Sequence, residues 1–128
     1  MDLPPYGKLL GLKPHREDDA LRFVMPASDD VMGRPGFLHG GAIAGLLEFT
    51  AFSTLSEKIG DDAVVMKPIT VTVDFMRGGL MVDTLAEAQI ERLGRRIANV
   101  EVFAWQKGRD KPIASAQMNL LLERPARA

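Results

Sequence analysis

Residues 36–59 read GFLHGGAIAGLLEFTAFSTLSEKI, and this stretch decides the fold. From Gly41 to Ile59 the apolar side chains cover nearly every side of a helix, which is the pattern of a buried helix. Gly60 follows, and a glycine at this position is typical of a helix end. We therefore predict one long buried helix over residues 41–59.

The residues on both sides of this helix alternate between apolar and polar types, which predicts strands with one buried face each. One strand or two precede the helix and four follow it. Short turns, Gly78-Gly79 among them, separate the later strands, and connections this short favour antiparallel neighbours. Residues 29–36, rich in Asp, Gly and Pro, predict a loop that leads to His39. The predicted strands are 21–25, 69–75, 86–91, 98–104 and 114–120.

A single helix cannot cover both faces of a sheet, so the predicted sheet must curl around it. This predicts an α+β architecture in which an antiparallel sheet wraps one long central helix, the arrangement called the hot-dog fold. The 128 residues suffice for one hydrophobic core and not for two, so we expect a single domain over residues 1–128.

The composition excludes several classes of function. Sixteen Lys plus Arg against 17 Asp plus Glu give a formal charge of −1, which argues against nucleic acid as a partner. The absence of cysteine excludes a thiolate nucleophile and a cysteine-based metal site, and it fits a cytoplasmic protein. No apolar stretch approaches the ~20 residues that cross a membrane. The sequence predicts neither a metal nor an organic cofactor.

His39, Gly40 and Gly41 open the predicted helix, where backbone N–H groups have no partner within the helix. These groups and the positive end of the helix dipole suit an oxygen that gains negative charge during a reaction, and glycine lets a substrate approach closely. Two simpler explanations stay open. The glycines can serve only a tight turn and close packing, and His39 can be a structural hydrogen-bonding group.

Glu48 is the only charged side chain between His39 and Glu57, and it lies within the helix predicted to be buried. Burial of a carboxylate without a partner costs free energy of folding. Such a residue therefore either pairs with another group or has a function in binding or catalysis. We expect burial to raise the pKa of Glu48 towards the range of a general base. A structural pair with an arginine, or an exposed position, is the alternative.

His39 and Glu48 are nine positions apart, which corresponds to roughly 13 Å along a helix. One copy of the helix cannot bring both residues to one carbonyl group. If the oxyanion donors and Glu48 act on the same atom, the carboxylate must come from a second chain related by a two-fold axis. The sequence therefore predicts self-association as a dimer or tetramer, with the active site at the subunit interface.

Three segments resemble the PaaI-like acyl-CoA thioesterases of the phenylacetic acid degradation type, a hot-dog family. In residues 36–55, as in that family, a His-Gly-Gly opens the central helix and an acid follows nine residues after the histidine. Residues 69–77 resemble the family's strand before its Leu-Arg-Pro turn, and residues 94–102, GRRIANVEV, resemble its Gly-Arg-Arg strand. Together the segments cover roughly residues 20–122.

The resemblance implies an enzyme that hydrolyses a small or aromatic acyl-CoA to the free acid and coenzyme A. It implies that the Gly40 N–H is the oxyanion donor, that Glu48 is the base or the nucleophile, and that His39 polarises or orients the carbonyl. Two positions depart from the family, because Gly33 stands where many relatives have asparagine and Pro68 stands near a common Ser or Thr. Both departures remove groups that position water or substrate.

Coenzyme A carries phosphate groups and an adenine, so arginines near the mouth of the site are candidate contacts, unless they are ordinary solvated strand ends. Apolar residues nearby can line the acyl pocket or belong to the core. The candidate substrate-binding residues are Gly41, Phe49, Phe52, Met76, Arg77, Arg92, Arg95 and Arg96.

Two other functions stay open. A hot-dog module that binds acyl-CoA but is catalytically weak or inactive is favoured by the departures at Gly33 and Pro68. A hot-dog dehydratase or hydratase uses an Asp-His pair in another arrangement, and the nine-residue spacing to Glu48 argues against it.

Overall fold

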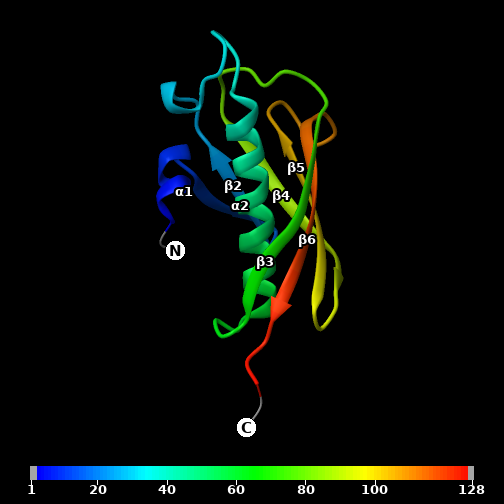
Figure 1. The fold of residues 1–128 in the computed structure, drawn as a ribbon. Helices are drawn as coiled ribbons and strands as arrows, with labels where there is room; N and C mark the ends of the chain where they lie inside the picture. The colour runs from blue at the N-terminus through cyan, green and yellow to red at the C-terminus, as the bar shows by residue number, and fades with distance from the viewer. Residues whose placement is uncertain (1–2, 127–128) are drawn as a thin grey trace.

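A computed structural model describes residues 3–126 and shows an antiparallel sheet that curls around one long helix (Figure 1). The sheet has six strands, and the helix lies along its concave face. The elements in chain order are α1 (Pro5–Leu10), β1 (Lys13–Glu17), β2 (Ala20–Met25), the 3-10 turn η1 (Asp29–Val31), α2 (Gly40–Ile59), β3 (Val65–Phe75), β4 (Thr84–Leu93), β5 (Ile97–Trp105) and β6 (Pro112–Glu123).

The strands lie in the order β1-β2-β4-β5-β6-β3, and every neighbouring pair is antiparallel. The predicted α+β hot-dog fold is therefore confirmed. The long helix begins one residue earlier than predicted, at Gly40, and each predicted strand is present with slightly wider bounds.

The connection through Gly78-Gly79 does not join paired strands, so the prediction of antiparallel neighbours across this turn is wrong. β3 pairs with β6, whereas β4 pairs with β2 and β5. The prediction considered only the two glycines, but the whole connection runs over residues 76–83 and is long enough to cross the end of the sheet. This crossing leaves β3 at one edge of the sheet and β1 at the other.

Helix α1 and strand β1 are absent from the sequence prediction. Pro5 occupies the first turn of α1, and Gly11 ends the helix with a left-handed φ of 70°. This combination of proline and glycine is a usual sign of a short helix. Strand β1 is exposed at all five positions, so it lacks the alternation that marks a half-buried strand.

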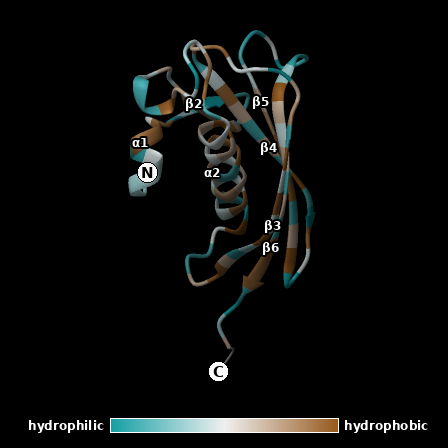
Figure 2. Ribbon diagram, turned by 45° about the horizontal axis from the view of Figure 1, so that its top comes forward, coloured by the Kyte–Doolittle hydropathy of each residue, from teal (hydrophilic) through white to brown (hydrophobic). Residues whose placement is uncertain are grey.

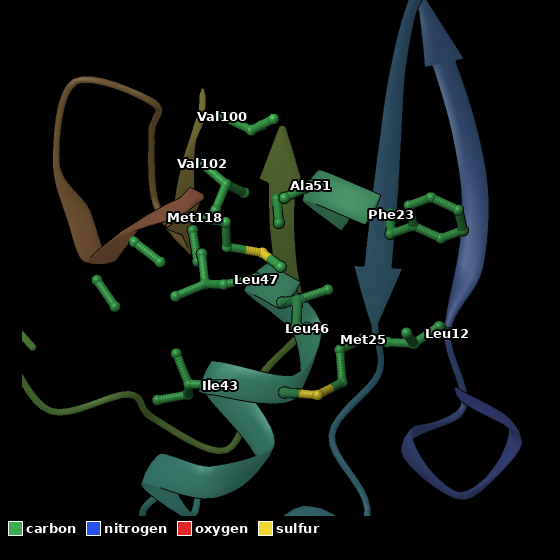
Figure 3. Packing of buried hydrophobic residues seen from close by; sticks show 14 of the residues in the cluster. Leu12, Phe23, Met25, Ile43, Leu46, Leu47, Ala51, Val100, Val102 and Met118 are labelled. Carbon is green, nitrogen blue, oxygen red and sulfur yellow. The ribbon is translucent and has the colours of Figure 1, made fainter. Parts of the chain in front are cut away.

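The core lies between α2 and the concave face of the sheet (Figure 3). Apolar positions alternate with polar ones along β2, β5 and β6, so each of these strands turns one face towards α2 (Figure 2). Burial of one large apolar side chain stabilises the fold by about 1.5–3 kcal/mol. The largest fully buried side chains include Phe23, Met25, Leu46, Leu47, Leu55, Val100, Val102, Met118 and Leu120.

Helix α2 is not buried on all sides, which corrects the prediction. Its face away from the sheet is exposed at Glu48, Phe52 and Ser56, because only the short α1 covers this face. The predicted buried face of β3 is also wrong in part, since Ile69 and Phe75 are more than half exposed. Strand β3 has a neighbour on one side only and carries an irregular register near Ile69.

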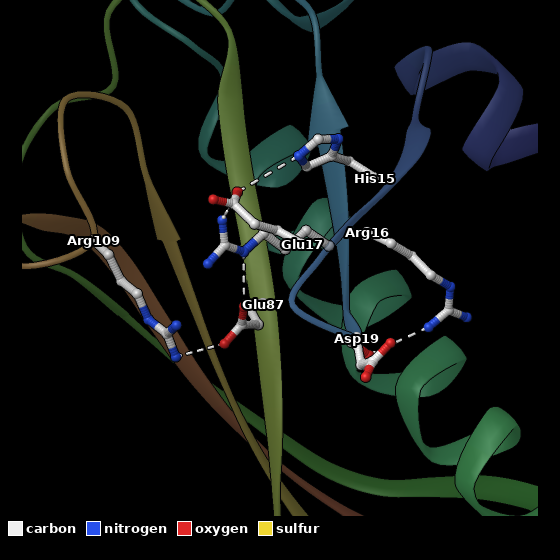
Figure 4. A network of polar contacts seen from close by, with 7 residues as sticks. His15, Arg16, Glu17, Asp19, Glu87 and Arg109 are labelled. Carbon is white, nitrogen blue, oxygen red and sulfur yellow. Dashed lines mark hydrogen bonds and ion pairs between the residues drawn. The ribbon is translucent and has the colours of Figure 1, made fainter.

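The convex face of the sheet carries an ion-pair network that ties β2 to β4 (Figure 4). The Arg22 guanidinium donates to Glu87 at 2.7 Å and to Glu17 at 2.6 Å, and it lies over the Trp105 ring. Arg109 also pairs with Glu87, at 2.5 Å. The hydrogen bond to Glu87 raises the pKa of Arg22 above its ordinary value. This network lies on the side of the sheet away from α2 and stabilises the fold.

Candidate active site

His39 occupies the N-cap position of α2, with an extended backbone. Its Nδ1 accepts a hydrogen bond from the Gly41 N–H at 2.8 Å, and its carbonyl accepts from Ala42 at 3.0 Å. Because Nδ1 is an acceptor, the neutral ring carries its proton on Nε2. The Nε2–H group of His39 can therefore donate to a substrate at the start of α2.

The Gly40 N–H donates no hydrogen bond to any group within residues 3–126. A Cβ at this position would contact only the Phe75 ring, at an ordinary 3.5 Å. At Gly41, by contrast, a Cβ would lie 2.9 Å from His39 Nδ1. Glycine at 41 therefore lets the imidazole fold over the helix end, and the free N–H of Gly40 is an available donor for an oxyanion.

The loop before α2 is held in place by backbone hydrogen bonds. The His39 N–H donates to Val31 at 2.8 Å, and the Leu38 N–H donates to Gly79 at 2.9 Å. A Cβ on Gly33 would lie 3.0 Å from the His39 Cα, so a larger residue there needs the loop to shift by a few tenths of an ångström. This close approach gives a physical reason for glycine where the family often has asparagine.

Glu48 lies on the face of α2 that points away from the sheet, on the wall of a pocket of ≈ 190 Å³. It is the only charged residue of that wall, and it has no ion pair or hydrogen bond within residues 3–126. Its predicted burial is wrong, because α1 closes only one side of this pocket and Glu48 is exposed in the part of the chain that the structure describes. The pocket is lined by Pro4, Tyr6, Gly7, Leu10, Gly45, Glu48, Phe49, Phe52, Pro68 and Met118.

Gly40 and Glu48 do not meet within one chain. Both belong to α2, and the eight positions between them correspond to about 12 Å along a helix. One chain thus places the donors at the start of α2 and the carboxylate about two turns further on.

The other predicted residues do not lie together. Phe49 and Phe52 line the Glu48 pocket, as the sequence predicted, whereas Met76 is exposed and lies outside it. Arg77 lines a different pocket, of ≈ 180 Å³, together with Lys107 and Lys111. Arg95 and Arg96 lie with Arg124 at the end of the sheet opposite the start of α2, and Arg92 is exposed on β4 (Figure 1).

Sequence reasoning missed the wall that α1 contributes to the Glu48 pocket. Tyr6, Leu10 and Gly45 belong to that wall, and so does Met118 of the core. The proline and glycine that bound α1 could have revealed the helix, but nothing in the sequence indicates that it packs on Gly45. Lys107 and Lys111 were missed because exposed lysines in a turn carry no pattern of their own.

The described part of the chain holds no group of three or more His, Cys, Asp or Glu side chains that could bind a metal ion. Within residues 3–126, no helix combines the length and the apolar character needed to cross a membrane.

Comparison with known proteins assigns the class. Residues 35–113 match the family model of the thioesterase superfamily. A solved protein of Chromobacterium violaceum is 32% identical, with 93% of this chain and 83% of that chain covered and a TM-score of 0.76. The chain therefore belongs to the thioesterase superfamily, which confirms the resemblance found in the sequence.

Two further solved structures share the fold. A phenylacetic acid degradation-related protein of Ralstonia eutropha is 21% identical, with a TM-score of 0.84 over 94% of this chain and 92% of that chain. A Bacillus halodurans protein solved with CoA is 18% identical, with a TM-score of 0.86 over 97% of this chain and 82% of that chain. No curated protein matches the chain.

Proposed function

We propose that this protein is an acyl-CoA thioesterase that hydrolyses a small or aromatic acyl-CoA to the free acid and coenzyme A. The observation that carries the proposal is Glu48, an unpaired carboxylate on the wall of an otherwise uncharged, largely apolar pocket. Membership of the thioesterase superfamily and the free Gly40 N–H at the start of α2 support it.

In the proposed reaction, the thioester carbonyl oxygen accepts a hydrogen bond from the Gly40 N–H, and His39 Nε2–H helps to polarise it. Glu48 takes the proton of the attacking water, or attacks the carbonyl carbon itself. The tetrahedral intermediate places negative charge on the oxygen that faces Gly40, where preorganised donors stabilise it most. Where Glu48 acts as the base, the C–S bond then breaks and coenzyme A leaves as the thiol with the proton that Glu48 took from the water. Where Glu48 attacks, coenzyme A leaves as the thiolate, which takes a proton from solvent, and a water molecule then hydrolyses the acyl–Glu48 anhydride to the free acid.

We further propose that Gly40 and Glu48 of one site come from two chains. Strand β3 supports this, because it is a long edge strand that exposes Val65, Ile69 and Phe75. The other edge, β1, is short and carries charged residues, which protect an edge from pairing. Two β3 edges paired about a two-fold axis would extend the sheet and place the open faces of two α2 helices side by side.

The phosphates of coenzyme A need cations, and two clusters offer them. Arg77, Lys107 and Lys111 share one pocket, and Arg95 and Arg96 share another with Arg124. None of the six forms an ion pair within residues 3–126, so their charges are available to phosphate, although the Arg124 Nε also donates to the Arg95 carbonyl at 2.9 Å. The Bacillus halodurans relative solved with CoA supports the same ligand for this chain.

A second candidate function is acyl-CoA binding without efficient hydrolysis. Pro68 favours it, because this residue lines the Glu48 pocket where a Ser or Thr side chain would help to position water. The proline ring adds only apolar surface to that wall.

The direct test is hydrolysis of acyl-CoA thioesters, followed by a reagent that detects the released thiol. We expect turnover of butanoyl-CoA or phenylacetyl-CoA by the purified full chain. Binding of both compounds with no thiol release above the uncatalysed rate would favour the binding module. Neither binding nor turnover would contradict both functions.

A further inference from the structure

Helix α1 closes one side of the Glu48 pocket. It packs directly on α2, and four of its residues or their neighbours line the pocket: Pro4, Tyr6, Gly7 and Leu10. The catalytic proposal above assigns no role to these residues. Their position raises the question of what α1 does for the substrate.

Tyr6 packs on α2 at Gly45 and Gly41. A Cβ on Gly45 would lie 2.7 Å from Tyr6 Cε2, so the ring occupies the space that any other residue at 45 would need. The Tyr6 hydroxyl donates to the Gly41 carbonyl at 3.3 Å. The tyrosine therefore lies along the first turns of α2, between the predicted oxyanion donors and Glu48.

The space that Tyr6 leaves beside Glu48 is small. At ≈ 190 Å³ the pocket is only slightly larger than a cavity of about 150 Å³ that takes one benzene molecule. On the side away from Tyr6, a larger neighbouring cavity of ≈ 600 Å³ shares Pro4, Phe49 and Phe52 with the pocket. The rest of its wall includes Ser56, Glu57 and Asp62, whose polar groups disfavour an alkyl chain. An apolar group beside Glu48 is thus limited by a ring at one end and by polar side chains at the other.

From these contacts we infer that Tyr6 is the residue that limits the size of the acyl group, with its ring as the end wall of the acyl pocket. This inference rests on the proposed thioesterase function and deepens it by naming the substrate class, compact acyl groups of about the size of one aromatic ring. The ring performs this function, whereas the hydroxyl holds α1 against the first turn of α2.

The test compares chain-length profiles of full-length variants. Tyr6→Ala should raise the ratio of kcat/KM for decanoyl-CoA to that for butanoyl-CoA by at least roughly tenfold, since a hydrophobic pocket discriminates by such factors. Tyr6→Phe keeps the ring and should keep the wild-type profile. Gly45→Ala should move the profile in the same direction as Tyr6→Ala, because its Cβ displaces the ring. If Tyr6→Ala does not fold, Gly45→Ala decides alone.

Leu9→Ala is the matched control. Leu9 belongs to the same short helix but is exposed and lies outside the pocket, so this variant should keep the wild-type profile. Folding of each variant is checked by thermal unfolding. An unchanged profile in both folded Tyr6→Ala and Gly45→Ala, or an equal change in Leu9→Ala, would overturn the inference.

A binding series separates this inference from the proposed function. Non-hydrolysable S-butyl-CoA and S-decyl-CoA are titrated against each variant by calorimetry. If no acyl-CoA is hydrolysed but Tyr6→Ala selectively tightens S-decyl-CoA, the size limit stands and the hydrolase proposal fails. If hydrolysis is normal and position 6 changes neither profile, the size limit fails and the hydrolase proposal stands. If neither thioether binds to the protein, the inference is contradicted.

Discussion

We propose that His39 has two functions at one position. Its Nδ1 caps the helix by accepting from the Gly41 N–H, which leaves Nε2–H free to donate to a substrate. The close contact between His39 and Gly41 explains why a glycine follows the first one. The three consecutive residues His39, Gly40 and Gly41 thus determine the hydrogen bonding at the start of α2. The Gly41 N–H donates to His39, and the Gly40 N–H is left free within residues 3–126.

Substitution of His39 can separate these two functions. His39→Ala removes the cap and should lower the free energy of unfolding by about 1 kcal/mol, whereas His39→Ser supplies another cap and should restore most of it. Both variants lack the Nε2–H donor, so both should lose turnover by up to ~10². Thermal unfolding and thiol-release kinetics check this. Full turnover in His39→Ser would show that the imidazole only caps the helix.

Glu48→Gln tests the carboxylate. This variant keeps the shape and removes the base, so turnover should fall by at least ~10² while acyl-CoA binding persists. Because Glu48 is exposed and has no partner within residues 3–126, the free energy of unfolding should change by less than about 0.5 kcal/mol. A large loss of stability, with activity lost only in parallel, would identify a structural carboxylate instead.

Glu48 also shows how far a sequence predicts a site. A charge alone among apolar residues identified the position, but the same pattern predicted burial, and the carboxylate is exposed. When a helix carries apolar residues on every side, the sequence does not reveal which side packs on the sheet, which side packs on another chain and which side is exposed. Tyr6 could not be placed in the pocket at all, since its contact with Gly45 joins segments whose packing no periodicity encodes.

Strand β3 is the element through which we propose that two chains assemble. It is an edge strand with large apolar side chains exposed, and such an edge is a template for pairing with another chain. The irregular register between Pro68 and Thr70 lies within this strand and next to the Glu48 pocket. Pairing through β3 would therefore bring the partner chain to the wall of the site.

Ile69→Lys should convert the assembled protein into monomers. The Ile69 side chain is 55% exposed in one chain, so the lysine should change the stability of a single chain little. In a dimer, however, the two lysines would bring like charges together at the paired edge. Turnover should fall with the loss of the dimer, as sedimentation and kinetics measure. Val82→Lys, at a similarly exposed residue of the 76–83 connection, is the control. An Ile69→Lys variant that stays assembled would exclude β3 as the interface.

The strands around this edge show what alternation can and cannot predict. The bounds of β5 are predicted to within one residue and those of β6 to within three, because Val100, Val102 and Met118 alternate with polar positions against α2. The order of strands was not predictable from the turns, since the β3 to β4 connection crosses the sheet end. β1 has no buried side chain, so no hydrophobic pattern marks it.

At the scale of the whole molecule, the proposed site needs Gly40 and Glu48 from two chains. Gly40 and Glu48 lie on one rigid helix at about 12 Å along its axis, so no side-chain movement brings them to one carbonyl. A two-fold axis that pairs β3 edges would supply both sites of a dimer at once. One chain alone should then be inactive even when it is fully folded.

Mixed dimers of two inactive variants test this two-chain site most directly. Glu48→Gln removes the base, and Gly40→Val fits beside Phe75 but blocks approach to the N–H, so each alone should lose at least ~10² in turnover. Co-expression with two different affinity tags and tandem purification isolates dimers that hold one chain of each kind. One site of such a dimer carries both substitutions and the other carries none, so about half of the wild-type turnover should return. Mixed dimers no more active than either variant alone would show that Gly40 and Glu48 act within a single chain or not at all.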